Sequence, residues 1–121
     1  MKIVTLTGTT NTSGALTVTA SEAVVGFVEK IVMDYGDGDT GADAVFTCVE
    51  GLVSTPIMTK ADLGTADAVF FPRTPGNTVA AGAAFTNWAD KIFVTGKMKV
   101  VIASGGSEKD FVFHVVISDE R

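Results

Sequence analysis

Apolar residues recur at every second position along most of this chain, which is the spacing of β-strands, whereas the 3.6-residue spacing of helices is scarce. Residues 2–7 alternate in this way, and residues 15–20 repeat the pattern after a Gly-containing stretch at 11–14. Thr and Val, which favour strands, are abundant in both segments. The N-terminal part therefore predicts a β-hairpin with its loop at 11–14.

The longest apolar run, residues 24–35, predicts a strand that is hydrophobic on both faces. Alternation assigns its side chains to two sets: Val25, Phe27, Ile31 and Met33 on one face, and Val24, Val28 and Val32 on the other. Such a strand is either central in the fold or faces a partner subunit. Shorter strands are predicted at 44–50 and 67–72, and the second ends at Pro72 because proline cannot donate to a ladder.

The C-terminal part predicts a three-stranded meander, with strands at 91–95, 97–104 and 109–118 and turns at Gly96 and 104–107. In the last strand one face is a core face, and the other is too apolar for an ordinary solvated surface. The core face holds Phe111, Phe113, Val115 and Ile117, and the second face holds Val112, His114, Val116 and Ser118.

Residues 73–90 interrupt the alternation with a Thr-Pro-Gly-Asn stretch and a run of very small side chains. They predict one long loop, with a single helical turn near 86–90. The chain is thus expected to be a single all-β domain over residues 1–121, a β-sandwich of about eight short strands with one long loop. A jelly roll is the more specific alternative.

Composition supports one core and excludes several classes of function. Hydrophobic residues make up 46% of the 121 residues and charged residues 19%. The net charge of −5 argues against a surface that tracks nucleic-acid phosphates. The N-terminal residues lack the unbroken apolar core of a signal peptide, and no stretch is long enough to span a membrane. We therefore expect a chain that is made in the cytoplasm and has no nucleic-acid or membrane partner.

Residues that could carry catalysis are sparse. His114 is the only histidine, so His-paired metal sites and a Ser-His-Asp triad have little support, and no Gly-x-Ser-x-Gly elbow is present. Cys48 is the only cysteine, which excludes an intrachain disulfide and a cysteine-based zinc site. It alternates within a predicted strand and is interpreted as a small hydrophobe. The chain is predicted not to be an enzyme and to need no cofactor.

The strongest polar cluster is an acidic, glycine-rich stretch at 34–43, whose Asp37, Asp39 and Asp43 are candidate oxygen ligands for calcium. The EF-hand spacing is absent, because counting from Asp37 puts a glycine at the fifth position and a cysteine at the twelfth. The favoured interpretation is a solvated loop between two strands, without a metal.

Several short phrases follow one another in a characteristic order. They are Gly14-Ala15, Val18-Thr19-Ala20, Val25-Gly26 and Ile31, then Asp39-Thr40-Gly41-Ala42-Asp43, Pro56 and Thr59, and finally Phe71-Pro72-Arg73 and residues 96–106. In this order of features the chain resembles a group of small virion proteins of tailed bacteriophages that includes capsid cement, or decoration, proteins. The likeness covers most of the chain, and the ending from Val112 to Arg121 departs from it.

The resemblance implies a β-rich subunit that sits as a homotrimer on the outer capsid surface, binds the major capsid protein and bridges neighbouring capsomers. Candidate interface positions are Phe93, Val101, Val112 and Val116, because a closed oligomer would cover doubly apolar strands. Trp88 either anchors the interface or plugs one end of the sandwich. The alternatives are a neck, tail or fibre-associated virion protein and a carbohydrate-binding module built on Trp88 and the acidic stretch.

Overall fold

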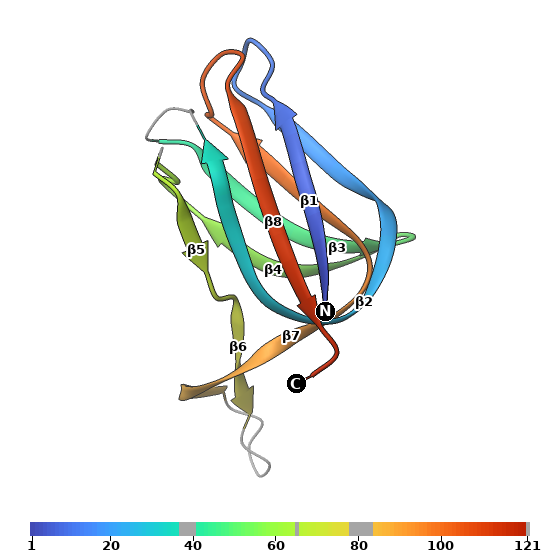
Figure 1. Cartoon of the computed structure of the whole chain (residues 1–121). Coiled ribbons are helices and arrows are strands. Elements are labelled where there is room, and N and C mark those ends of the chain that lie inside the picture. Colours follow the sequence, from blue (N-terminus) through green and yellow to red (C-terminus); the bar gives the residue numbers. More distant parts are fainter. Residues whose placement is uncertain (37–40, 65, 78–83, 121) are drawn as a thin grey trace.

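The computed structural model describes residues 1–36, 41–64, 66–77 and 84–120, which form eight strands and no helix (Figure 1). The strands are β1 (Lys2–Thr9), β2 (Leu16–Gly36), β3 (Asp43–Glu50), β4 (Val53–Lys60), β5 (Ala68–Phe70), β6 (Arg73–Asn77), β7 (Ala84–Ala103) and β8 (Asp110–Ser118). Within these residues there is consequently no helix that could cross a membrane.

The strand pairs are all antiparallel and are nested inside one another. β1 pairs with β8, the first half of β2 with β7, the second half of β2 with β5, and β3 with β4. This nesting results when one long antiparallel ribbon, with its tip between β3 and β4, is rolled up on itself. Two further ladders, β2 with β8 and β7 with β3, join successive turns of the roll. The resulting order, β1-β8-β2-β7-β3-β4, is that of a jelly roll when the two halves of β2 are counted separately.

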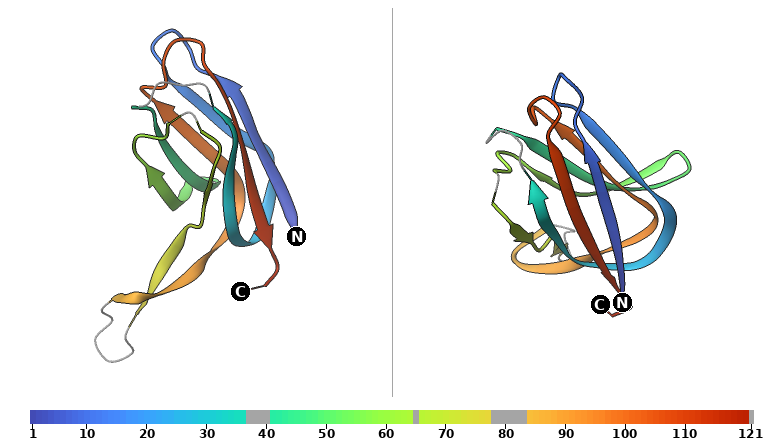
Figure 2. Two further views of the ribbon diagram at one scale, coloured as in Figure 1. Left: turned by 60° about the vertical axis from the view of Figure 1, so that its left-hand side comes forward. Right: turned by 45° about the horizontal axis from the view of Figure 1, so that its top comes forward.

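The roll has two facing layers, and β2 passes through both (Figures 1 and 2). One layer contains β1, β8, the second half of β2 and β5; the other contains the first half of β2, the second half of β7, β3 and β4. The rings of Phe46 and Phe113 meet edge to face between the layers at 5.1 Å, inside one buried cluster. The predicted all-β, sandwich-like fold is confirmed, but β2 and β7 are 21 and 20 residues long in place of short strands.

The core face predicted for the last strand is confirmed. Its four side chains are no more than 2% exposed: Phe111, Phe113, Val115 and Ile117. β8 stays in one register with β1 along its whole length, so strict alternation holds on this strand.

The alternation predicted for the longest run fails at a β-bulge. The pairing of β2 with β8 shifts between Val28 and Lys30, which leaves an extra residue on β2. One extra residue reverses which side chains face the core. Core residues are consequently even-numbered before the bulge and odd-numbered after it: Val24 and Val28, then Ile31 and Met33. The prediction that Val25 and Phe27 share a face with Ile31 and Met33 is wrong, and Val25 is 67% exposed.

Gly96 lies inside β7 and does not form the predicted turn. β7 continues through it, paired with β2 on one side and with β3 on the other. The φ angle of Gly96 is +127°, and a Cβ atom there would lie 2.4 Å from the carbonyl oxygen of Val49. Glycine is therefore required by a close backbone approach. The predicted meander is also wrong, because the second half of β7 and β8 lie in different layers.

The predicted loop at 73–90 contains strand on both sides. β6 pairs with the first part of β7, beginning with Arg73 opposite Lys91, and residues 86–90 are strand where a helical turn is predicted. Figure 2 shows this ribbon extending away from the two layers. β4, which the sequence pattern misses, pairs with β3 beside it.

The turn predicted at 11–14 forms, but the strands that it joins separate. The Asn11 N–H donates to the carbonyl oxygen of Ala15 at 2.9 Å, and the Asn11 side-chain oxygen accepts from the Ser13 and Ala15 N–H groups. Beyond this turn β1 enters one layer and the first half of β2 enters the other. The predicted N-terminal hairpin is therefore wrong beyond its turn, and among the described strands β1 pairs with β8.

Candidate interaction surface

His114 lies on the outer face of β8 between a hydroxyl and a carboxylate. Its Nδ1 is 3.0 Å from Thr5 Oγ1 on β1, and its Nε2 is 3.2 Å from Asp34 Oδ2 on β2. The order hydroxyl, imidazole, carboxylate is also that of a catalytic triad. Here the three groups lie on the outer face of the sheet, with the His114 and Asp34 side chains 30% and 63% exposed. We interpret the contacts as a polar tie across three strands.

The acidic candidates do not form a described metal site. Asp37 and Asp39 lie outside the described residues. Asp43, at the start of β3, accepts the Asp62 N–H on its Oδ1 at 3.2 Å, which ties the segment after β4 to β3. Among the residues that the structure places, no group of three or more metal-ligating side chains comes together.

Cys48 is a core residue of β3 and is 1% exposed. The pKa of its thiol is raised above the ordinary value, mainly because the thiol is buried and secondly because the Glu50 carboxylate is nearby. A raised pKa keeps the thiol protonated and unreactive at neutral pH. This agrees with its interpretation as a small hydrophobe.

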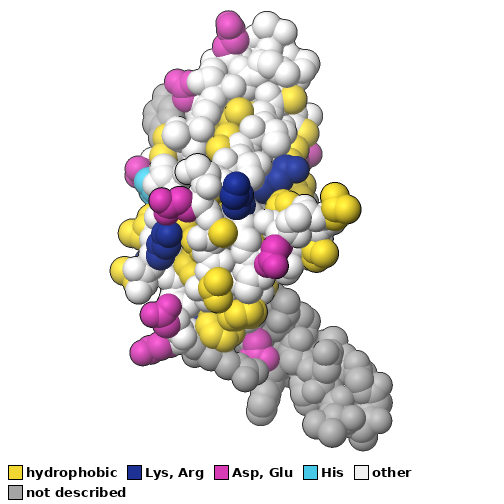
Figure 3. Space-filling view, turned by 90° about the vertical axis from the view of Figure 1, so that its right-hand side faces the viewer, with side chains coloured by type: hydrophobic (Ala, Val, Ile, Leu, Met, Phe, Trp, Pro, Cys, Tyr) yellow, Lys and Arg dark blue, Asp and Glu magenta, His cyan; other side chains and the backbone are white. Residues whose placement is uncertain are grey.

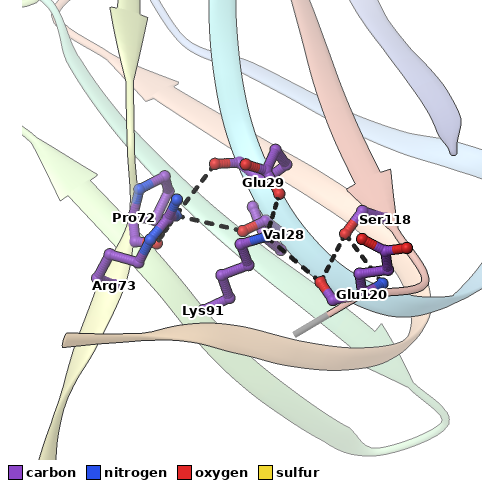
Figure 4. A network of polar contacts seen from close by, with 7 residues as sticks. All are labelled: Val28, Glu29, Pro72, Arg73, Lys91, Ser118 and Glu120. Carbon is purple, nitrogen blue, oxygen red and sulfur yellow. Dashed lines mark hydrogen bonds and ion pairs between the residues drawn. The ribbon is translucent and has the colours of Figure 1, made fainter.

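A polar network fixes the root of the β6–β7 ribbon to the layers (Figure 4). The Arg73 guanidinium donates to three carbonyl oxygens, those of Val28, Glu29 and Pro72, at 3.4, 3.0 and 2.7 Å. Lys91 Nζ lies 2.5 Å from Glu29 Oε2 and also donates to the Glu120 carbonyl oxygen at 3.3 Å. The bulge of β2, both strands of the ribbon and the end of β8 are thus held together.

The Glu29–Lys91 pair predicts a pH-dependent contribution to stability. The hydrogen bond from Lys91 is the largest cause that lowers the Glu29 pKa from its ordinary value of 4.5. A lowered carboxyl pKa stabilises the fold above the unfolded pKa, and this contribution is lost as the pH falls through the folded pKa. We expect Glu29→Gln to lower the thermal midpoint at neutral pH and to match the wild type in strong acid. Midpoints measured by circular dichroism across this range check the result.

Glu22→Gln is the matched control for that series. It removes an exposed ion pair, Glu22 with Lys2, whose side chains are 76% and 49% exposed. Surface pairs of this kind contribute little. A Glu29→Gln midpoint that tracks this control at every pH would contradict the stabilising role of the Lys91 contact.

An apolar exposed surface lies where β2 bends from one layer into the other. Phe27 is opposite Phe93 and Val25 is opposite Thr95 in the β2–β7 ladder, so these side chains share an outer face. The Phe27 and Phe93 rings pack edge to face at 5.2 Å, and Phe93 remains 52% exposed. We call Val25, Phe27 and Phe93 the bend patch. Figure 3 views the side that carries the bend and shows hydrophobic side chains gathered on its lower part.

Comparison of the chain with protein-family models, curated proteins and solved structures found no match.

The structure distributes the predicted interface residues over three surfaces. Phe93 belongs to the bend patch. Val101 is half-buried on the outer face of β7, beside Val45 on β3. Val112 is half-buried on the outer face of β8, whereas Val116 is 6% exposed and therefore offers little surface to a partner. The side chain of Trp88, in the first part of β7, lies outside the described residues.

Sequence reasoning missed Val25 and Phe27 as surface partners of Phe93. Their position depends on the bulge in β2, which reverses the inward and outward sides of that strand. The signal in the sequence was that the strand is apolar on both faces. One of those faces must lie outside the chain's own core and is therefore a candidate surface for a partner.

Proposed function

We propose that the chain is a structural subunit of a phage particle, a cement or decoration protein that binds the outer capsid surface as a homotrimer. The bend patch carries this proposal. It places an aromatic pair and a valine, exposed by 52% for Phe93 and 67% for Val25, on the outside of a paired ladder. Aromatic side chains on a rigid surface are common anchors of protein interfaces.

The rolled fold suits a subunit that must resist mechanical strain. Its long strands β2 and β7 each belong to ladders on both sides, so displacement of either strand would disrupt several ladders at once. Jelly rolls are used in viral capsids and also in lectins, so the fold alone is support by analogy. The order of sequence phrases from Gly14-Ala15 to residues 96–106 favours the virion role over the lectin role.

A homotrimer would cover the bend patch by closed symmetry. In a three-fold ring each copy presents one surface to the next copy and a second, different surface to the previous one, and the ring closes without leaving either surface unpaired. We assign the bend patch to this contact between copies. The capsid contact then uses other outer faces, with the half-buried Val101 and Val112 as its candidates.

The copy number in purified virions tests the proposed function. We expect quantitative mass spectrometry of the producing phage to give hundreds of copies per particle, in a fixed ratio to the major capsid protein. The reason is that a cement subunit occupies every equivalent position of the capsid lattice. A handful of copies would move the chain to the neck, tail or fibre, and absence from the virion would overturn the proposal.

A further inference from the structure

The edges of the two layers are protected unequally. An exposed strand edge invites pairing with another chain, and proteins usually protect it with proline, charges, bulges or very short strands. β4 carries Pro56 and a bulge in its ladder with β3, and β5 is three residues long. β1 has eight residues, one continuous register with β8, no proline, and a single charge, Lys2 at its start. From Ile3 to Thr9 β1 is therefore a weakly protected edge.

The hydrogen-bonding groups on that edge can be assigned. The Thr10 N–H donates to the Lys109 carbonyl oxygen at 2.8 Å, which continues the β1–β8 register by one pair. In an antiparallel ladder alternate residues direct both backbone groups to the same neighbour. Even-numbered residues of β1 therefore bond to β8. The backbone groups of Ile3, Thr5 and Thr7 point to the free edge, where the described residues provide no backbone partner.

A groove lies beside this edge. One wall is formed by the consecutive residues Lys2 to Thr5, as expected for a backbone edge, and the other by Ala20, Ser21 and Glu22 of β2. The ladder of β2 with β7 is interrupted at that second wall, between Thr19 and Ala23. The groove has a volume of about 170 Å³, and the exposed Lys2–Glu22 ion pair spans it with a 3.0 Å contact.

The two walls define the shape of a ligand. Because the β2 wall faces this edge across the groove, a lone strand suits the opening better than the edge of a whole sheet. A second copy of this chain is a poor donor, because each of its described strands already belongs to a ladder. The ligand is therefore an extended segment of a different polypeptide.

We propose that this groove receives one extended segment of the capsid shell protein, which adds to β1 as an antiparallel or parallel strand. The inference rests on the proposed function and specifies how the subunit attaches to the shell. About four residues of the segment, roughly 13 Å long, match the wall from Lys2 to Thr5. Small or apolar side chains of the segment would pack against Val4 and Ala20. An acidic residue of the segment would pair with Lys2 and a basic one with Glu22, in place of the ion pair between these two.

Thr5→Pro tests the strand addition. Proline removes the Thr5 N–H, which points to the groove, and leaves the β1–β8 ladder intact, so the variant is expected to fold. Thr5→Val is the matched control, because it removes the contact with His114 and keeps the N–H. Binding to shells of the producing phage assembled without this chain is measured by co-sedimentation. We expect Thr5→Pro to weaken binding at least tenfold and Thr5→Val to bind like the wild type.

Hydrogen exchange of the wild type provides a readout that does not depend on how the variant folds. The Ile3 and Thr5 amides should exchange quickly in the free protein and become protected on the same shells. Shell binding without this protection, or equal binding by Thr5→Pro, would overturn strand addition and leave the cement role standing. If these amides become protected when the protein concentration alone is raised, the edge of β1 pairs with a second copy of the chain. This result would also overturn strand addition by the shell protein. No binding to shells at all would overturn the proposed function itself.

Discussion

Replacing Phe113 with alanine is expected to lower the free energy of unfolding by about 3–5 kcal/mol. The ring is fully buried, meets Phe46 of the opposite layer edge to face at 5.1 Å, and stacks on Phe111 at 6.1 Å. The substitution loses the buried area of the ring, both aromatic contacts and the packing around the cavity that remains. Because a domain of this size has about 5–15 kcal/mol in total, the variant should be close to unfolding. Urea denaturation followed by circular dichroism measures the loss.

Val112→Ala is the control for that experiment. Val112 directly precedes Phe113 on β8, is half-buried on the outer face and leaves no enclosed cavity when truncated. We expect it to cost about 1 kcal/mol or less. A similar cost for both substitutions would contradict the arrangement of the two layers, because it would mean that Phe113 is not between them.

Alternation predicts burial where a strand has no extra residue. On β8 the pattern from Phe111 to Ile117 identifies the core side chains correctly. On β2 the same reasoning fails, because the extra residue between Val28 and Lys30 reverses the two faces. The local sequence does not fix the position of this bulge, because its place is set by the register with β8, about 90 residues later in the chain.

Glycine and proline also mislead when they are interpreted locally. Gly96 resembles a turn, yet it is needed because a carbonyl oxygen of β3 passes too close for a side chain. The Thr-Pro-Gly-Asn stretch resembles a loop, yet β6 runs through it. In both places the partner strand determines the structure, and the partner is unknown from the sequence.

The candidate interaction surface could be predicted only in part, again because the strand partners are unknown from the sequence. Phe93 is recognisable as an apolar residue in a doubly apolar region, but its partner Phe27 becomes visible only when the β2–β7 register is known. The ties of His114 to Thr5 and Asp34 join residues 109 and 80 positions apart in the chain. No spacing rule connects them, because the rolled topology brings them together.

Phe93→Asp is expected to convert the proposed homotrimer into a monomer of the 12.5 kDa chain. In the proposed trimer the aspartate would be buried without a partner next to Phe27, and it would also break the aromatic contact at 5.2 Å. An interface anchor of this kind contributes about 2 kcal/mol or more, which corresponds to roughly 30-fold or more in the dissociation constant. Sedimentation velocity at micromolar concentration measures the change in mass.

Val69→Asp is the matched control, because Val69 on β5 is 49% exposed, close to the exposure of Phe93, and pairs with Val32 away from the bend. The trimer should survive this substitution, since the same charge is then added outside the bend patch. Dissociation by both variants would indicate a general effect of the added charge and remove the bend patch from the interface. A wild-type chain that is already monomeric at micromolar concentration would exclude the trimer. Such a result would mean that Val25, 67% exposed, and Phe93, 52% exposed, remain in contact with water without a partner copy.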